Sequence, residues 1–422
     1  MAASADYAAR FEAAAPQTLF PRLDREEQAF VRALAYGHRF TLQELRQVCE
    51  AAADLAAWGE PPLRMWWPAT IPADGQAAGR AKDQGLSHLR QHLVRLRSQV
   101  PVYPAGGLAA PRRALPKLRL VRESRVLVGR CPCASPQVVC CGLMTLDAVR
   151  GCGFACSYCT IQTFYAGQVL FDPDLAQGLA DLQLPPGYVH LGTGQASDGL
   201  MWANRHGLLT TLCAFARARP QVLLELRTKA ANVAPLLRAD PPPNLFPSWS
   251  LNPPTLVAGE EHLAAPLASR LRAARRAADA GLKVAFHLHP LMRFAGWERE
   301  YADLARELID TFDASEVAYV SMGTVAFIKP VLQAIRRRGG QTRVLQPDYV
   351  TGPHGKLTYP EGARVDLYRL LSESLGPWRG HVYQSLCLEP ATVWQAVFGV
   401  EGMDSARFTA QSVANLRTKL GV

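Results

Sequence analysis

Residues 151–160 read GCGFACSYCT and place three cysteines, Cys152, Cys156 and Cys159, at spacings of x3 and x2, with the aromatic Tyr158 directly before the last cysteine. Cluster irons prefer soft thiolate ligands, and a compact loop with three thiolates can bind three irons of a cubane while the fourth iron has no protein ligand. An iron with an open position is available for chemistry. The spacing therefore predicts a 4Fe-4S cluster with one iron open to a small molecule.

The same cysteines are also compatible with half of a zinc site or with three unrelated core thiols. Structural zinc requires a fourth nitrogen or sulfur ligand, and its cysteines usually come in paired C-x2-C units. The x3 and x2 spacing does not have that form, and the aromatic residue before the last cysteine agrees with a cluster. We therefore favour the cluster.

The whole chain has 422 residues, of which 49% are hydrophobic and 19% charged, as in an ordinary soluble globular protein. The start of the chain lacks the basic segment and apolar core of a secretory signal, and no apolar run approaches membrane-spanning length. We expect a cytoplasmic protein with no membrane partner. Seven of the ten cysteines lie between residues 131 and 159, and a reducing compartment favours cofactor binding over disulfides.

The net charge of +10 raises the expectation of a polyanionic partner. Between residues 80 and 130, twelve basic residues stand against Asp83 and Glu123; the twelve are Arg80, Lys82, Arg90, Arg95, Arg97, Arg112, Arg113, Lys117, Arg119, Arg122, Arg125 and Arg130. Such a segment can follow a phosphate backbone, or it can be a solvated helix face followed by a basic linker. Charge alone does not separate the two interpretations.

The order of the elements predicts the fold class. Residues 1 to about 100 are expected to be helical, with one helix after a capping box of Thr41 and Glu44 and a second helix over 86–100. From Gly142, short β-rich runs alternate with helical stretches, and an irregular or hairpin-like insertion is expected over 343–360. The predicted strands are 143–149, 188–193, 222–228, 245–251, 283–289 and 317–323, and the predicted helices are 266–280, 298–311, 365–375 and 391–398.

This alternation predicts right-handed crossovers and a parallel sheet that curls into an α/β partial (β/α)6 barrel of the TIM-like type, with the site at the carboxyl ends of the strands. The expected division is an N-terminal helical and basic extension (residues 1–130), the barrel with its closing elements (131–400) and a C-terminal tail (401–422).

Several segments between about residue 140 and about residue 400 together resemble the spore photoproduct lyase family of radical S-adenosylmethionine enzymes. They are GCGFACSYCTIQ, LGTGQASDGL, ELRTKAANV, SWSLNPP, ARRAADAGLKVAFHLHP, GWEREY, VSMGT and LCLEPATVWQAVFG. The resemblance implies a six-stranded partial barrel of the radical S-adenosylmethionine type, one 4Fe-4S cluster and S-adenosyl-L-methionine. It also implies a DNA-repair lyase that cleaves a carbon–carbon cross-link between thymines with a 5'-deoxyadenosyl radical, with reduced flavodoxin or ferredoxin as the electron donor.

The resemblance also implies roles for individual residues. Cys152, Cys156 and Cys159 match the cluster ligands, and Tyr158 matches an aromatic residue near the adenosyl group. The residues expected to bind the cofactor are Tyr158, Gly194, Ser197, Asp198, Lys229, Ser250 and Asn252. The Lys229 ammonium is expected to pair with the carboxylate of the methionine moiety.

One departure from the family pattern concerns the hydrogen donor. Family lyases have a cysteine three residues before the aspartate of the second-strand motif, and it returns a hydrogen atom to the thymine radical; here that position is Gln195. The amide N–H bond is too strong for this step. A tyrosine expected after the last cluster cysteine is also missing, with Thr160 in its place. Tyr158 and Cys387 are the catalytic candidates that remain, although Cys387 also fits a core thiol.

Three further groups have open interpretations. Cys131, Cys133, Cys140 and Cys141 suit a second metal or reduced thiols, although adjacent cysteines coordinate one metal awkwardly. His287 and His289 lie on the same face of a strand, as a polar contact to substrate or cofactor or as a satisfied core pair. Candidate contacts to nucleic-acid phosphates are Arg343, Lys356 and Tyr359.

The leading hypothesis is a radical enzyme that repairs a thymine-derived or other DNA lesion. The alternatives are a radical S-adenosylmethionine enzyme acting on RNA, a peptide or a small molecule, and a non-catalytic iron–sulfur protein that binds nucleic acid. Salt-dependent DNA binding would argue against the first alternative, and reductive cleavage of the cofactor would exclude the second.

Overall fold

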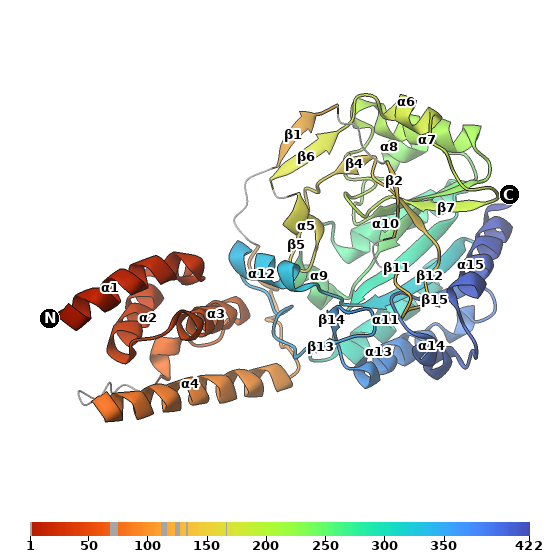
Figure 1. The fold of residues 1–422 in the computed structure, drawn as a ribbon. Coiled ribbons are helices and arrows are strands. Elements are labelled where there is room, and N and C mark those ends of the chain that lie inside the picture. Colours follow the sequence, from red (N-terminus) through yellow and green to blue (C-terminus); the bar gives the residue numbers. More distant parts are fainter. Residues whose placement is uncertain (1, 68–74, 111–115, 123–126, 132–133, 166) are drawn as a thin grey trace. The chain divides into compact units, whose positions relative to one another are not determined.

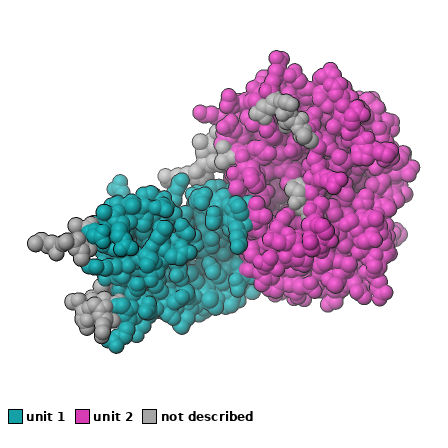
Figure 2. Space-filling view, viewed as in Figure 1, with its two compact units in different colours: residues 1–104, 108–112, 329–348 teal, residues 105–107, 113–328, 349–422 magenta. Residues whose placement is uncertain are grey.

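The computed structural model describes residues 2–67, 75–110, 116–122, 127–131, 134–165 and 167–422. The chain forms two compact units, coloured separately in Figure 2. Unit 1 comprises residues 1–104, 108–112 and 329–348, and unit 2 comprises residues 105–107, 113–328 and 349–422. The boundaries expected at residues 130 and 400 stay predictions.

Unit 1 is helical. Its helices are α1 (Ala2–Ala14), α2 (Arg25–His38), α3 (Leu42–Trp58), α4 (Gly75–Ser98) and α12 (Lys329–Arg338), with short 3-10 turns at Ala15–Gln17, Phe20–Arg22 and Leu63–Met65. The predicted capping box starts α3, since Glu44 accepts a hydrogen bond from the Thr41 backbone and the Thr41 hydroxyl accepts one from the Glu44 backbone. In α12, Arg336 donates two hydrogen bonds to the buried Asp54 of α3, at 2.7 and 3.0 Å, which ties this distant segment to the N-terminal helices.

Unit 2 is built on an eight-stranded, curled sheet, an open half-barrel with the α/β architecture predicted from the sequence (Figure 1). In sheet order its strands are β15 (Tyr383–Leu386), β12 (Val317–Thr324), β11 (Val284–Leu291), β9 (Leu245–Ser250), β8 (Val222–Thr228), β7 (Val189–Gly192), β3 (Met144–Leu146) and β2 (Val128–Arg130). Neighbouring strands pair in parallel except β2, which is antiparallel to β3.

The central strands are continuous apolar runs because both faces of the sheet are covered. Every residue of β8 except Arg227 is buried, and β12 is buried up to its last residue. The helices of this unit are α5 (Ile161–Phe164), α6 (Leu175–Ala180), α7 (Leu208–Ala218), α8 (Ala234–Arg238), α9 (Pro254–Glu260), α10 (Leu267–Asp279), α11 (Trp297–Thr311), α13 (Glu361–Ser374), α14 (Ala391–Phe398) and α15 (Ser405–Leu420).

The structure differs from the predicted strands in two places. The stretch 143–149 is not one strand, because the chain leaves the large sheet after β3 and its next residues pair elsewhere, as β4 (Val149–Arg150) with β6 (Gln168–Phe171). The large sheet also gains β15 and β2, which are too short to give a clear periodic signal. β6 also pairs with β1 (Lys117–Leu120), and the expected hairpin consists of β13 (Val350–Thr351) and β14 (Leu357–Thr358).

No helix in the described ranges combines the length and the apolar character needed to cross a bilayer.

Candidate active site

The three cysteines of the 151–160 motif lie in a loop that is bonded to neighbouring strand ends. Gly151 has φ of +90°, and a Cβ there would lie 2.0 Å from the Gln168 carbonyl oxygen, so this turn requires glycine. The Gly151 N–H donates to the Ala196 carbonyl at 2.8 Å, and its own carbonyl accepts from the Ser197 hydroxyl at 2.6 Å. These bonds place the loop beside the carboxyl end of β7, where parallel barrels carry their sites.

The second half of the loop is fixed by a two-residue ladder. β5 (Ala155–Cys156) pairs with β10 (Glu261–His262), in antiparallel register. As a result Cys152, Cys156 and Cys159 all line one cavity of about 190 Å³.

The possible metal ligands of this cavity include three thiols. In the described part of the chain, no group of three or more His, Cys, Asp or Glu side chains is arranged to hold one metal ion. A cubane does not require such a group, because each sulfur binds a different iron. Burial raises the pKa of Cys152 and of Cys156 above the ordinary thiol value, so both are protonated at neutral pH and would have to release protons to bind a metal as thiolates.

Glu261 organises the wall of this cavity beside the cysteines. Its carboxylate, which is fully buried, accepts hydrogen bonds from the Tyr158 hydroxyl at 2.5 Å and from the Asn252 amide at 2.8 Å. Arg270 lies 2.5 Å from the other carboxylate oxygen, Oε2. The Lys229 Nζ lies 3.8 Å from Oε1, the oxygen that Tyr158 and Asn252 contact. Burial alone raises a carboxyl pKa, but the Lys229 and Arg270 charges reverse this and lower the pKa of Glu261.

This arrangement positions four of the predicted cofactor residues. Lys229 and Tyr158 line the cavity, with the Lys229 Nζ 5.8 Å from the centre of the Tyr158 ring. Asn252 is fully buried and engaged by Glu261 and the Tyr301 hydroxyl, so the structure places it behind the wall of the cavity. Ser250 lines the cavity, and its carbonyl accepts from Arg270.

Ser197 and Asp198 line the same cavity, but their side chains are already bonded to protein groups. The Asp198 carboxylate accepts hydrogen bonds from the Thr228 hydroxyl and from the backbone N–H groups of Leu200, Met201 and Lys229, all within 3.0 Å. Ser197 donates to Gly151 and accepts from the Trp202 indole. Both residues therefore connect the ends of β7 and β8 to the cysteine loop.

A second buried carboxylate, Glu225 of β8, contacts side chains from the neighbouring strands β7, β11 and β12. Its oxygens lie 2.6 Å from His287 Nε2 and 3.1 Å from His190 Nε2, and they accept bonds from the Tyr319 hydroxyl at 2.6 Å and from Arg227 at 3.0 Å. Burial by itself would raise the pKa of Glu225. The charge of Arg227 and the interactions with His287 and His190 outweigh this effect and hold the pKa of Glu225 well below its usual value. These bonds fix Arg227 at the cavity, where a Cβ on Gly194 would lie 2.7 Å from the Arg227 Cβ.

Part of the chain matches a known protein family. Residues 186–351, which begin after the cysteine loop and include Gly194, Ser197, Asp198, Lys229, Ser250 and Asn252, match the family model of spore photoproduct lyase. Over these residues the chain is similar to spore photoproduct lyases.

Two curated members of that family are similar over shorter stretches. The spore photoproduct lyase of Clostridium acetobutylicum is 22% identical over 181 residues, which are 41% of this chain and 54% of the relative. That of a Geobacillus species is 32% identical over 78 residues, 18% of this chain and 23% of the relative. The chain thus spans about half the length, or less, of these spore photoproduct lyases.

Solved spore photoproduct lyases share the fold of the half-barrel. One, complexed with dinucleoside spore photoproduct, gives a TM-score of 0.54 at 22% identity, over 63% of this chain and 81% of the other. A variant solved with bound AdoMet and dinucleoside spore photoproduct gives 0.53 with the same identity and coverage. These similarities confirm the predicted α/β fold of an open half-barrel.

The position that departs from the spore photoproduct lyase pattern opens into a second cavity. Gln195 lines this hollow of about 170 Å³ together with Cys387. Arg227, His287 and His289 line both this cavity and the one with the cluster cysteines, so the two meet at these three side chains. Each histidine has a hydrogen-bond partner in the protein: His287 lies 2.6 Å from Glu225, and His289 lies 3.0 Å from the Ser321 hydroxyl. Both also line the two cavities.

The described cysteines of the second group, Cys131, Cys140 and Cys141, line that second cavity as well. Cys133 lies outside the described residues, as do Arg112, Arg113, Glu123 and Arg125 of the basic segment.

The candidate phosphate contacts do not come together in one unit. Arg343 belongs to unit 1, where it donates to Glu60 and Gln346. Lys356 and Tyr359 belong to unit 2, and Tyr359 is buried, with its hydroxyl accepting from the Arg293 backbone. The basic segment is divided as well: Lys82 pairs with Glu44 in unit 1, and Arg122 pairs with Asp174 in unit 2.

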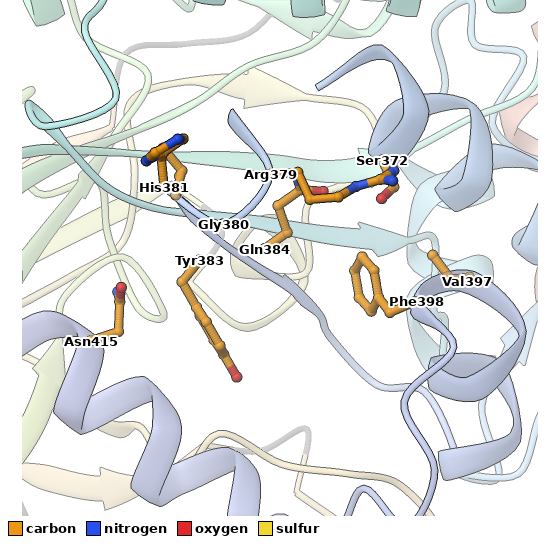
Figure 3. A pocket seen from close by; sticks show the side chains of 10 residues that line it. Ser372, Arg379, Gly380, His381, Tyr383, Gln384, Val397, Phe398 and Asn415 are labelled. Carbon is orange, nitrogen blue, oxygen red and sulfur yellow. The ribbon is translucent and has the colours of Figure 1, made fainter. Parts of the chain in front are cut away.

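Another pocket, shown in Figure 3, lies at the amino end of β15. Its lining residues are Ser372, Arg379, Gly380, His381, Val382, Tyr383, Gln384, Val397, Phe398 and Asn415. None of these was a candidate from the sequence. Because it opens at the amino rather than the carboxyl end of a parallel strand, it is not the expected position of a barrel site.

Sequence reasoning missed Glu225, Arg227, Glu261 and Arg270. Acidic residues inside apolar strands, as in VLLELRT, were a usable signal for Glu225, because a buried carboxylate requires partners. Glu261 gave no such signal, since its neighbours Tyr158 and Arg270 are brought to it only by the fold.

Proposed function

We propose that this protein is a radical S-adenosylmethionine enzyme of the spore photoproduct lyase type that repairs a thymine-derived lesion in DNA. The observation that carries the proposal is the position of Cys152, Cys156 and Cys159. They line one cavity at the carboxyl end of β7.

In this proposal the three cysteines bind three irons of a 4Fe-4S cluster, and the cavity beside them receives S-adenosyl-L-methionine. When bound, these groups supply a 5'-deoxyadenosyl radical by reductive cleavage of the cofactor. Lys229, with its ammonium already beside the Tyr158 ring, is the group that binds the methionine carboxylate. Gly194, Ser197, Asp198 and Ser250 line the rest of this pocket.

The protein's own side chains hold this pocket in place before any ligand enters. Glu261 fixes Tyr158 and balances Lys229, and Asp198 connects the ends of β7 and β8. Tyr158, as a catalytic candidate, has its hydroxyl proton directed to Glu261, and the burial of this pair raises the pKa of Tyr158. It therefore remains a neutral phenol at physiological pH.

DNA is the proposed substrate, with reduced flavodoxin or ferredoxin as the electron donor. Support comes from the names of the relatives, which are spore photoproduct lyases, and from a solved relative in complex with dinucleoside spore photoproduct. The net charge of +10 favours the same class of partner.

The test is anaerobic. Reconstituted protein is reduced in the presence of S-adenosyl-L-methionine and ultraviolet-irradiated DNA, and 5'-deoxyadenosine and restored thymine are measured together. Cys159→Ala should abolish both products, whereas Cys213→Ala, which removes a buried thiol of α7 outside the cavity, should not. The proposal fails if deoxyadenosine forms at the same rate without DNA and no lesion disappears. Consumption of irradiated RNA in preference to DNA would reassign the substrate.

A further inference from the structure

The second cavity is closed on one side by a segment that crosses the opening of the half-barrel. We call residues 134–143 the wall segment. Within it, Val139 N–H donates to the Glu389 carbonyl at 2.9 Å, just beyond β15, and Cys140 N–H donates to the Ser405 hydroxyl at 3.0 Å. The chain then enters β3 at Met144, so this segment links the two sides of the open sheet.

Sulfur atoms line this cavity from two directions. Cys140 and Cys141 belong to the wall segment, and Cys387 follows the carboxyl end of β15. The Cys387 N–H donates to the Met322 carbonyl at 2.8 Å, which continues the β15–β12 pairing by one residue and fixes its position. Gln195 lies on the wall of the same cavity, so the cavity contains thiols although the motif position itself has none.

Cys387 lies beside the junction of the two cavities. A Cβ on Gly323 would lie 2.9 Å from the His289 ring and 3.3 Å from the Cys387 Cβ, so His289 and Cys387 are neighbours across this glycine. His289 is one of the residues that line both cavities. A substrate in the second cavity would therefore lie between the Cys387 thiol and the cavity of the cluster cysteines.

The thiols differ in protonation. Burial raises the pKa of Cys387 to about 12, so it keeps its S–H at neutral pH. The Cys141 thiol donates a hydrogen bond to Cys140 and lowers the pKa of Cys140 to about 6, so Cys140 is largely a thiolate. Only a protonated thiol can donate a hydrogen atom, which excludes Cys140 but leaves both Cys141 and Cys387. The position of Cys387 beside His289, where the two cavities meet, favours Cys387.

We propose that the second cavity binds the damaged pyrimidine and that Cys387 returns the hydrogen atom which completes the repair, in place of a thiol at the Gln195 position. This inference rests on the proposed function. The Cys387 S–H bond breaks as a C–H bond forms on the pyrimidine, and the unpaired electron moves from carbon to sulfur. One electron from the one-electron reductant that the cluster requires, with one proton from water, restores the thiol.

The first experiment tests the cavity without any turnover. Iodoacetamide labels the Cys140 thiolate, and the rate is followed by mass spectrometry with and without ultraviolet-irradiated thymidylyl-thymidine, with unirradiated thymidylyl-thymidine as the control. The bound dinucleotide should slow alkylation of Cys140 by about tenfold, because it fills the space that the reagent must enter. An unchanged rate at saturating dinucleotide overturns the assignment of this cavity.

The second experiment follows the hydrogen atom. Thiol protons exchange with solvent, so in deuterium oxide the wild-type protein should return thymine that carries one deuterium. Cys387→Ala and Cys387→Ser should still consume the lesion and form 5'-deoxyadenosine, but should give about 100-fold less deuterated thymine. Cys213→Ala should behave as wild type.

The outcomes are distinct. Deuterated thymine at the wild-type yield from both Cys387 variants overturns the inference. Protection of Cys140 by the dinucleotide, combined with no lesion consumption by the wild-type protein, retains the binding cavity and refutes the repair reaction instead.

Discussion

The Tyr158 hydroxyl donates a hydrogen bond of 2.5 Å to Glu261, a carboxylate 103 residues further along the chain. Glu261 also has Arg270 at 2.5 Å, and both of these charged side chains are fully buried. One carboxylate therefore positions the aromatic residue of the cysteine motif and neutralises a buried guanidinium.

Glu261→Gln should destabilise unit 2. The variant leaves Arg270 buried without an opposite charge, which costs about 3 kcal/mol of unfolding free energy. Urea unfolding measures this loss, with Glu307→Gln on the exposed face of α11 as the control. Equal stability of the two variants would show that Glu261 is not the charge partner of Arg270.

Each of the three cysteines should be required for iron binding. Ser in place of Cys152, Cys156 or Cys159 substitutes a hard, poorly ionised hydroxyl for a thiolate, and cluster irons bind it weakly. Iron and sulfide analysis after anaerobic reconstitution should show a large loss for each variant and none for Cys213→Ser. Full iron content in any one of the three would remove that residue from the ligand set.

Gly194→Ala should lower the unfolding free energy by more than the backbone strain of a positive φ alone. Gly194 has φ of +97°, and its added Cβ would lie 2.7 Å from the Arg227 Cβ, whereas Gly207 has φ of +73° with nothing within 4 Å. Gly207→Ala thus measures backbone strain alone, about 1–2 kcal/mol. Gly194→Ala should lose more unfolding free energy than that and should weaken S-adenosylmethionine binding by calorimetry. Equal losses in the two variants would mean that Arg227 moves aside freely.

The Cys140 thiol should react as a thiolate near neutral pH. Its pKa is lowered to about 6 because Cys141 donates a hydrogen bond to it, so the alkylation rate should rise with pH and level off above about pH 7. Cys141→Ala removes the donor and should move this profile toward the ordinary thiol pKa, and Cys141→Ser should move it less. An unchanged profile in Cys141→Ala would exclude Cys141 as the cause.

Glu225 should contribute to the loss of folding stability at acid pH. Its pKa in the folded protein lies well below the value of 4.5 for a free side chain, so its stabilising effect is complete above that value. The effect is lost as the pH falls from about 4.5 toward the folded pKa, because the unfolded chain binds the proton first. Stability of the wild type should therefore fall more steeply over this range than that of Glu225→Gln, and Glu307→Gln should follow the wild type.

The sequence alone determined the fold class. Strands such as 222–228 were predictable because a parallel strand covered on both faces is mainly apolar, and the capping box at Thr41 was predictable because it is local. That Cys152, Cys156 and Cys159 lie together was predictable for the same reason, since they stand within eight consecutive residues, and their role as cluster ligands stays a prediction.

Only the tertiary structure decided which distant residues share the site. It placed Glu261 against Tyr158, moved Asn252 behind the cavity wall, and turned Cys387 toward the same cavity as Gln195. It also divided the predicted strand 143–149 between two sheets. The physical reason is that periodicity and spacing describe neighbours along the chain, whereas buried charges and thiols are paired by strand order and register across it.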